Sequence, residues 1–312
     1  ARGRGLQLAA IVAVGVLLAV VAPDAFPPST TTVVLVALVL SVAATLALQV
    51  TLGLGRAGPW STRYPLQNAV LVAGVLALFP AFGDGGALTA ILLSVVAAAV
   101  FAAVVVAPAL RGPVPSVPLP EGAIRFGVLL AAGAALVQVA QRGSVLAVSL
   151  LGDSTEETGY AALATGIALG VTYAVLQAST VALPHLAGGG EEAAADGEAV
   201  LRRLTVGLLT ATVVVTVPVA LLLDPLVTAV FGSDYEAATA AFGPALGLVV
   251  LAPVHALLVQ SSALRLAPEA SLAGGVALAV GFVVTAVVTI PTLAAAGGVL
   301  AVLVGTGLGV VV

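Results

Sequence analysis

Long apolar runs, separated by short stretches of Pro, Gly and charged residues, set the hydropathy pattern of this chain. A helix that crosses about 30 Å of hydrocarbon needs roughly 20 apolar residues at about 1.5 Å per residue. Ten runs approach or exceed this length, so we expect an all-α polytopic membrane protein with about ten transmembrane helices. The runs cover residues 5–22, 30–54, 65–82, 87–108, 123–151, 158–186, 203–223, 237–263, 270–290 and 293–312.

The composition supports this interpretation and excludes several function classes. Of 312 residues, 61% are hydrophobic and only 8% are charged, so few that a soluble protein of this size would lack a water-compatible surface. Cys is absent and only two His occur, so we expect no metal site. The sequence shows no Walker-type loop and no constellation of a nucleophile with a base, so we also expect no cofactor and no catalytic residues. Basic clusters with interleaved aromatic residues are also absent, so we expect no nucleic-acid partner.

The arginines predict how the helices are oriented. If ten spans are counted, nine of the ten arginines lie on one side, whereas the opposite loops carry acidic residues such as Asp84. An excess of Arg marks the cytoplasmic face. One such loop is expected to hold Arg63 beside Trp60 and Tyr64, which we interpret as interface anchors. The absence of Lys and the Ala, Val, Leu, Gly and Arg bias are typical of a high-GC prokaryote, so we expect a prokaryotic cytoplasmic membrane.

One proline-rich segment divides the chain. Residues 111–121 hold four prolines, a composition that favours an extended spacer over a helix. We expect residues 1–110 to form four helices, residues 111–121 a cytoplasmic linker, and residues 122–312 six helices. The chain begins without Met and ends in an apolar run, so we also expect a fragment of a longer protein.

Three stretches after the proline-rich segment carry a resemblance to a known family. Residues 141–152 and 158–161 combine an Arg-containing helix end, a short loop and a Gly-Tyr helix start. Residues 182–185 place a Pro at a helix end, and residues 230–238 read Phe-Gly-x-x-Tyr-x-x-Ala after the first Val. In order and spacing, these stretches resemble the C-terminal lobe of the polysaccharide flippase branch of the multidrug/oligosaccharidyl-lipid/polysaccharide exporter superfamily.

The resemblance implies two six-helix lobes around a central cavity. The four helices before the linker would be the remainder of the N-lobe, with the first two helices missing, and the six after it the C-lobe. It further implies a monomeric transporter, not an enzyme, that flips lipid-linked oligosaccharide or polysaccharide precursors by alternating access. Its partners would be a lipid-linked anionic glycan and membrane lipids.

Other functions stay open at this point. A cation-coupled multidrug exporter or a lipid II flippase belongs to the same superfamily. A membrane glycosyltransferase is a different class, which we consider less favoured because such enzymes place acidic residues in large external loops. The external loops predicted here are short.

Arg142 is the main candidate for function, because it is the one charge predicted well inside a span. A cation in hydrocarbon costs several kcal/mol, so it should face a cavity or a partner. Gln138 lies one helical turn before it, on about the same face. A guanidinium there would suit an anionic lipid pyrophosphate. Alternatively, Arg142 bonds to helix carbonyls or extends to the outer interface.

Further polar residues lie inside the predicted spans. Tyr173, Gln177 and Thr180 follow helical spacing and would either line a cavity for sugar hydroxyls or bond between helices. Gln49 has the same two interpretations. His255 would either take part in proton coupling or pack as a neutral group.

Overall fold

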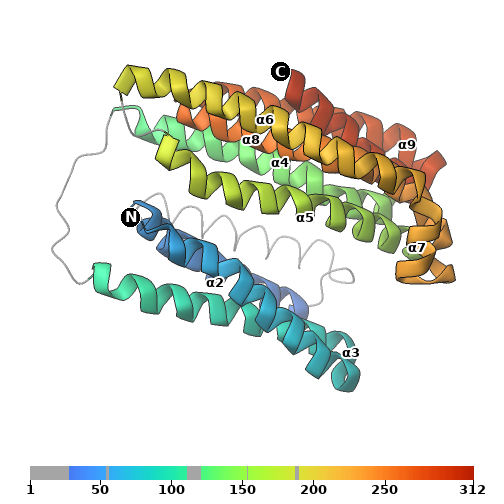
Figure 1. The fold of residues 1–312 in the computed structure, drawn as a ribbon. Helices are drawn as coiled ribbons and strands as arrows, with labels where there is room; N and C mark the ends of the chain where they lie inside the picture. Colours follow the sequence, from blue (N-terminus) through green and yellow to red (C-terminus); the bar gives the residue numbers. More distant parts are fainter. Residues whose placement is uncertain (1–27, 54–55, 111–120, 153, 187–189) are drawn as a thin grey trace. The chain divides into compact units, whose positions relative to one another are not determined.

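The computed structural model describes residues 28–53, 56–110, 121–152, 154–186 and 190–312 (Figure 1). The regular elements in these ranges are all helices, and the ranges contain no strand. Seven of the helices are long and apolar enough to cross a membrane. The chain is therefore an all-α, multi-pass membrane protein, as the hydropathy pattern predicts.

The chain divides into two compact units, Ala1–Val117 and Pro118–Val312, which we call the first and the second unit. The division falls within the predicted linker, of which residues 111–120 lie outside the described ranges. The arrangement of two lobes around a central cavity stays a prediction.

The described part of the first unit consists of α2 (Pro28–Gly53) and α3 (Ala57–Leu110). The helix α3 reverses direction at Gly83, whose φ of 54° and ψ of −134° suit a residue without a Cβ. Its two halves then pack closely, because a Cβ added at Gly74 would come 2.9 Å from the Cβ of Ala90. The break predicted between runs 65–82 and 87–108 falls at this reversal.

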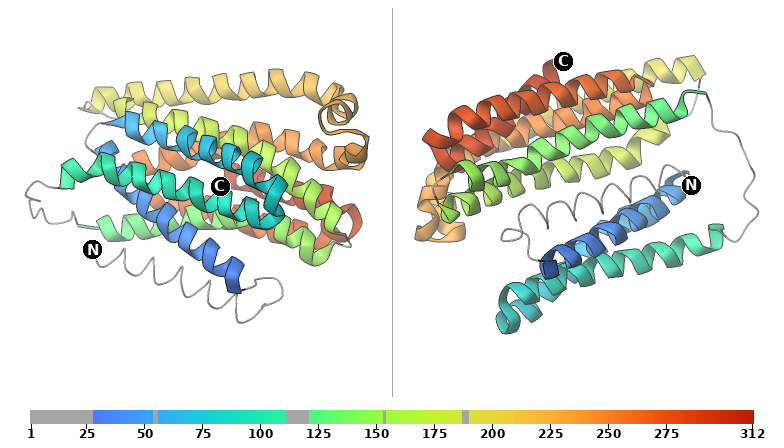
Figure 2. Two further views of the ribbon diagram at one scale, coloured as in Figure 1. Left: turned by 90° about the horizontal axis from the view of Figure 1, so that it is seen from below. Right: turned by 180° about the vertical axis from the view of Figure 1, so that it is seen from behind.

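The described residues of the second unit form a bundle of five long helices with two short elements at one end (Figure 2). Its elements are α4 (Ala123–Leu151), α5 (Thr155–Leu186), α6 (Gly190–Leu221), α7 (Leu223–Phe231), η1 (Ser233–Ala238), α8 (Thr239–Leu264) and α9 (Pro268–Val311). The helix α9 packs most extensively against α4 and α8, and α8 also packs against α5 and α6.

The helix α9 also folds back on itself. The reversal falls at Ala294, which has a φ of 47°. Beyond it, the backbone of the second half returns so closely that a Cβ on Gly297 would come 2.5 Å from the Thr289 carbonyl oxygen. Glycine is therefore required at position 297. The runs predicted at 270–290 and 293–312 are the two halves of this hairpin.

One face of α4 forms the main contact with α9. Its buried residues recur every three or four positions, which places them on one stripe. The contact is very close, because a Cβ on Gly275 of α9 would come 2.6 Å from the Gly133 carbonyl oxygen. Backbones in membrane bundles approach this closely where residues are small. The stripe comprises Gly133, Val137, Ala140, Gln141, Ser144 and Val148.

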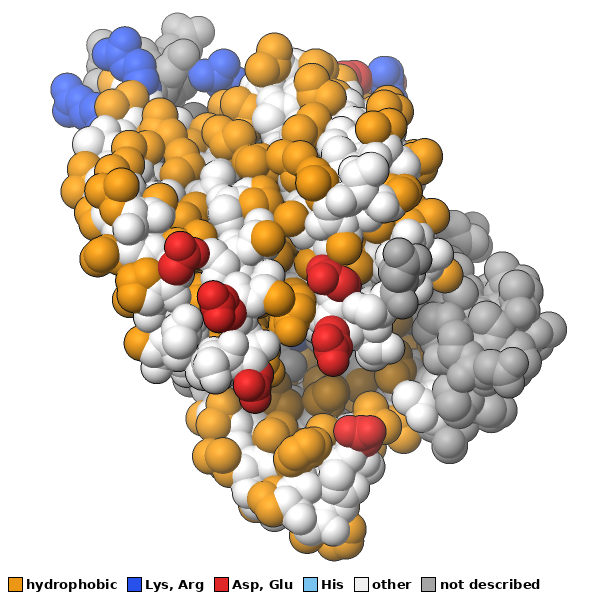
Figure 3. All heavy atoms as spheres, turned by 90° about the vertical axis from the view of Figure 1, so that its right-hand side faces the viewer, with side chains coloured by type: hydrophobic (Ala, Val, Ile, Leu, Met, Phe, Trp, Pro, Cys, Tyr) orange, Lys and Arg blue, Asp and Glu red, His pale blue; other side chains and the backbone are white. Residues whose placement is uncertain are grey.

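Charged side chains mark the two ends of the second unit. Arg125 at the start of α4 donates to Glu269 at the start of α9 over 3.1 Å, so these helix starts share one end. At the other end, Glu157 at the start of α5 accepts the N–H of Ala295 beside the α9 reversal over 2.9 Å. Further acidic side chains of the second unit lie at the α5 start, in α7 and in η1, and acidic groups are visible on the face drawn in Figure 3.

The observed bounds differ from the predicted runs in three places, the first being α3, which begins at Ala57 and not near residue 65. The helix α6 begins at Gly190, not near residue 203, because the Glu- and Ala-rich stretch before the apolar run is itself helical. The run predicted at 237–263 is preceded by η1, which belongs to the same long apolar stretch. The run at 5–22 lies outside the described residues, so the total of about ten helices stays a prediction.

Candidate functional site

Three polar side chains meet on the surface of the second unit where α4 and α5 lie side by side. Gln138 and Arg142 come from α4, one turn apart, and Tyr173 comes from α5. The adjacent Gln141 is buried on the stripe that faces α9, whereas Gln138 and Arg142 are exposed. The helical period therefore points this pair away from the core of the unit.

The three side chains form a closed triangle of hydrogen bonds. The Arg142 Nη2 donates to the Tyr173 hydroxyl over 3.0 Å, and the Arg142 Nε donates to the Gln138 Oε1 over 3.3 Å. The Tyr173 hydroxyl in turn donates to the same Gln138 oxygen over 3.1 Å. The guanidinium carbon lies 5.8 Å from the centroid of the Tyr173 ring, within cation–π range. We call Gln138, Arg142 and Tyr173 the arginine triad.

The charge of Arg142 is not compensated within the triad. Both hydrogen-bond partners are neutral, and in the described residues no acidic side chain forms an ion pair with it. Arg142 lies nine residues before the end of α4 at Leu151, which is about 14 Å along the helix axis. An exposed cation at this depth needs a polar surrounding, because lipid hydrocarbon would leave it unsolvated.

The triad contains three of the seven residues that the sequence nominates. Gln177 and Thr180 lie on α5, but their side chains lie outside the described part of the structure. Gln49 is exposed on α2 in the first unit. His255 is buried in α8 and faces Gly274 and Gly309 of α9 instead of the triad.

Arg63 also lies inside a helix, which the sequence does not predict. Arg63 was expected in a cytoplasmic loop, but α3 begins at Ala57 and Arg63 is only 2% exposed. It donates to the Thr45 hydroxyl over 2.5 Å and to the Ser41 hydroxyl over 3.2 Å, both from α2. The neighbouring Trp60 is likewise buried, in a cluster with Leu48, and is not an interface anchor.

The signal for Arg63 lies in the spacing of its partners. Ser41 and Thr45 are one helical turn apart in an otherwise apolar run, so their hydroxyls form a small polar patch on α2. The Thr45 hydroxyl donates to the Ser41 carbonyl oxygen of its own helix, and such patches often also bond to a polar side chain of a neighbouring helix. The sequence shows the patch, but it does not show which side chain meets it.

The described ranges contain no group of three or more His, Asp or Glu side chains that could hold a metal ion. Comparison with protein families, curated proteins and solved structures found no match to this chain. The flippase resemblance of the three sequence stretches therefore stays a prediction. The feature of the described structure that bears on function is the arginine triad.

Proposed function

We propose that this protein flips a lipid-linked oligosaccharide or polysaccharide precursor across the cytoplasmic membrane of a prokaryote. The observation that carries the proposal is an uncompensated guanidinium, Arg142, on an exposed face at membrane depth. Such a group requires an aqueous cavity or an anionic ligand. The pyrophosphate of a lipid-linked glycan would be this anionic ligand. The attached glycan is polar and would need an aqueous cavity to cross the membrane.

The triad would hold the substrate through its phosphate oxygens. Arginine has five N–H donors, and the bonds to Gln138 and Tyr173 use two of them. The remaining donors would bind phosphate in a bidentate manner, which a planar guanidinium does well. The Gln138 amide nitrogen, which takes no part in the triad's hydrogen bonds, would then be free to donate to sugar hydroxyls.

Transport would proceed by alternating access, in which the two lobes rock around a site near the midplane. No covalent step is needed, so the proposal requires no nucleophile, general base or cofactor. The protein would act as a monomer, with its arginine-rich helix ends in the cytoplasm, where anionic lipids and the positive-inside rule favour them.

The acidic residues argue against the other candidates. A cation-coupled multidrug exporter would be favoured by a carboxylate buried among its helices. Within the described residues, none of the buried side chains is acidic. The acidic side chains that enter hydrogen bonds, such as those of Glu157 and Glu269, lie close to helix starts. A lipid II flippase would share the pyrophosphate chemistry, and substrate competition would separate it from the leading proposal.

The test is head-group translocation by the full-length protein in vesicles loaded with a polyprenyl-pyrophosphate-linked oligosaccharide. We expect Arg142→Ala to lower the initial rate by roughly tenfold or more, because a charged hydrogen-bonded contact is worth about 1.5–3 kcal/mol. Arg142→Lys should restore only part of the rate, since an ammonium cannot form the bidentate contact.

Arg125→Ala is the matched control. It also removes an exposed arginine from α4, but at the start of the helix, where Arg125 pairs with Glu269. We expect its rate to stay within about twofold of the unmodified protein, because an exposed pair contributes less than about 1 kcal/mol. Undiminished transport by Arg142→Ala would remove the triad from the mechanism.

A further inference from the structure

The guanidinium of Arg142 is held along one edge only. In a planar guanidinium, the Nε–H and one Nη2–H lie parallel along the same edge. This edge is the bonded one in Arg142, because Nε donates to Gln138 and Nη2 donates to Tyr173. The edge at the end of the side chain is formed by Nη1 and the second Nη2–H. Among the described residues, no acceptor bonds to the Nη1 of Arg142, so this end edge is available to a ligand.

The guanidinium of Arg63 is bonded in the opposite way. Its Nη1 donates to Thr45 and its Nη2 to Ser41, so the α2 hydroxyls occupy the end edge. Its Nε is buried without a hydrogen-bond partner, and the whole residue is only 2% exposed. Arg63 therefore has no edge that a ligand could reach, whereas Arg142 is exposed.

The two acceptors that hold Arg142 are neutral. The Gln138 Oε1 and the Tyr173 hydroxyl oxygen occupy the two places that carboxylate oxygens take in a bidentate arginine–carboxylate pair. Because the Tyr173 hydroxyl donates to the Gln138 oxygen over 3.1 Å, the two oxygens lie side by side without repulsion. The pair thus orients the guanidinium as a carboxylate would, but it leaves the positive charge uncompensated.

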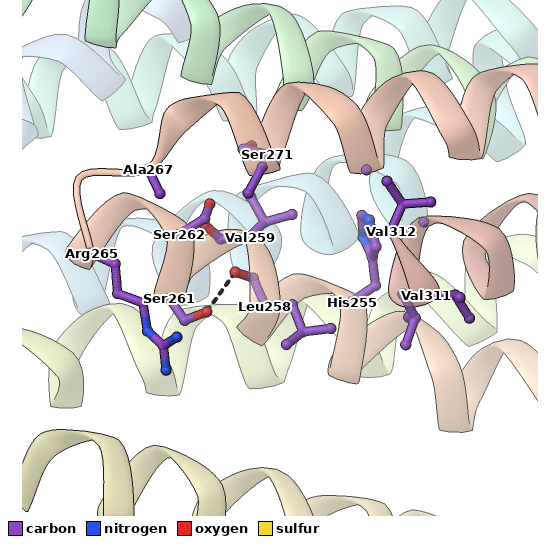
Figure 4. Close-up of a pocket in the computed structure, with 14 residues that line it drawn as sticks. His255, Leu258, Val259, Ser261, Ser262, Arg265, Ala267, Ser271, Val311 and Val312 are labelled. Carbon is purple, nitrogen blue, oxygen red and sulfur yellow. Dashed lines mark hydrogen bonds between the residues drawn. The ribbon is translucent and has the colours of Figure 1, made fainter. Parts of the chain in front are cut away.

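A ligand would reach Arg142 from the exposed face of α4 and α5. The cavity of about 270 Å³ drawn in Figure 4 lies elsewhere in the second unit, between α8 and α9. His255 and Arg265 are among its lining residues, and the three residues of the arginine triad are not. Binding at the triad therefore depends on the charge and the N–H donors that the guanidinium presents, not on enclosure by this cavity.

We infer that Gln138 and Tyr173 are positioning residues for Arg142, and that the neutral side chain of Gln138 is what allows the site to bind an anion. A phosphoryl group with two non-bridging oxygens fits the free end edge. A glutamate at position 138 would form the same contact with Nε but would neutralise the guanidinium. The inference rests on the proposed function, because its ligand is the phosphate of the proposed substrate.

The experiment measures equilibrium binding by the full-length protein, purified in detergent and freed of lipid. The probe is a polyprenyl pyrophosphate that carries no sugar, and the reference is the uncharged polyprenol of the same chain length. We expect the unmodified protein to bind the pyrophosphate lipid at least roughly tenfold more tightly, because only this lipid makes a charged contact. Equal affinities for the two lipids would overturn the inference.

Gln138→Glu separates the charge of the side chain from its position. The introduced carboxylate accepts the Arg142 Nε–H at least as well as the amide does, so a purely positioning role predicts unchanged affinity. We instead expect affinity for the pyrophosphate lipid to fall roughly tenfold or more. Affinity for polyprenol should stay the same, and the unfolding temperature should be unchanged or higher. Undiminished binding of the pyrophosphate lipid would contradict the role assigned to Gln138.

Gln138→Leu and Tyr173→Phe each remove one contact without adding a charge. Each should weaken binding of the pyrophosphate lipid by roughly 2- to 13-fold, the effect of one neutral hydrogen bond. The loss should be smaller than that caused by Gln138→Glu. If Gln138→Leu instead weakens binding more than Gln138→Glu does, position and not charge decides the affinity.

Ser154→Asp is the matched control for an added negative charge. Ser154 precedes the α5 start, where its hydroxyl accepts the Glu157 N–H, and an aspartate can keep this cap. It lies beyond the end of α4, which is itself about 14 Å from Arg142 along the helix axis, so salt screens the two charges. Affinity should stay within about twofold. A loss as large as that of Gln138→Glu would mean that any added negative charge has this effect.

Binding and transport can fail separately, because the probe carries no sugar and does not have to cross a membrane. If Arg142→Ala slows transport but Gln138→Glu binds the probe normally, the proposed function stands and this inference fails. If Gln138→Glu loses the probe but Arg142→Ala transports at the full rate, the triad is an anion site and the proposed function fails.

Discussion

Arg63 in the first unit and Arg142 in the second both lie within an apolar helix, and their surroundings differ. Arg63 is six residues after the start of α3, buried, and held by Ser41 and Thr45 of a neighbouring helix. Arg142 is nine residues from the nearer end of α4, exposed, and held by one residue of its own helix and one of α5. In both cases the named hydrogen-bond partners are neutral.

The comparison separates a structural cation from a functional one. Arg63 is buried and bonds to the hydroxyls of Ser41 and Thr45, so its side chain links α3 to α2. Arg142 is not enclosed by helix contacts and has N–H donors available at the surface. Removing the Arg63 side chain should therefore change stability, and removing the Arg142 side chain should change ligand binding.

The largest expected effect on stability comes from Arg63→Ala. It removes the bonds to Ser41 and Thr45 and leaves a void between α2 and α3, which should cost roughly 2–4 kcal/mol. Arg142→Ala, on an exposed face, should cost less than about 1 kcal/mol. The free energy of unfolding in mixed micelles, measured by denaturant titration, compares the two. Equal losses of unfolding free energy in the two variants would contradict a structural role for Arg63 alone.

A double-mutant cycle sharpens the assignment of Arg63. The pair Arg63→Met and Thr45→Val removes the charge and its closest acceptor with little change of volume. Thr45→Val alone leaves the buried Arg63 guanidinium without this acceptor, whereas in the double variant the guanidinium is absent as well. We therefore expect a coupling free energy of about 1–2 kcal/mol between the two substitutions.

The control cycle pairs Arg63→Met with Thr89→Val. Thr89 lies on the same helix but is exposed and donates to the Gly85 carbonyl oxygen of its own helix. Its coupling to Arg63 should be close to zero. A comparable coupling in both cycles would show that the Thr45 bond is not specific.

A pair of neighbouring glutamates extends the comparison to negative charge. Glu157 accepts the Ala295 N–H beside the positive-φ residue Ala294, whereas Glu156 is exposed. Glu157→Ala should lower the free energy of unfolding by about 1–2 kcal/mol, since the Ala295 N–H loses a charged acceptor. Glu156→Ala keeps this bond and should change the free energy of unfolding by less than about 0.5 kcal/mol. Similar losses would indicate a general effect of charge at the α5 start.

The smallest effect is expected for the ion pair of Arg125 and Glu269. Their side chains are 76% and 59% exposed, so water and salt screen the 3.1 Å contact. A double-mutant cycle of the two alanine variants should give a coupling below about 0.5 kcal/mol. A coupling as large as that of Arg63 with Thr45 would mean that burial is not what distinguishes these charges.

Much of the fold could be predicted from hydropathy, and part of the site from helical spacing. The runs at 30–54, 123–151 and 158–186 agree with α2, α4 and α5 within a few residues. The prediction that Gln138 shares a face with Arg142 is confirmed, because one turn of helix fixes it. That Tyr173 completes the triad could not be predicted, since it depends on how α5 packs beside α4.

The error at Arg63 has a physical cause. The stretch that contains Trp60, Arg63 and Pro65 has low hydropathy, and a proline often marks a helix start, so the helix was expected to begin there. In the structure, α2 supplies hydroxyls to the guanidinium and apolar contacts to the indole. These partners come from another helix, and no local pattern in the sequence identifies them.

By itself the sequence determined that this chain is an all-helical membrane protein, because backbone groups in lipid must bond within a helix and apolar runs of this length must cross. It also determined which side chains share a helix face, because the helical period is fixed. Only the tertiary structure decided which faces meet. That choice buried Arg63 against Thr45, left Arg142 exposed beside Tyr173, and buried His255 against glycines of α9, since contacts between helices depend on packing that no single helix encodes.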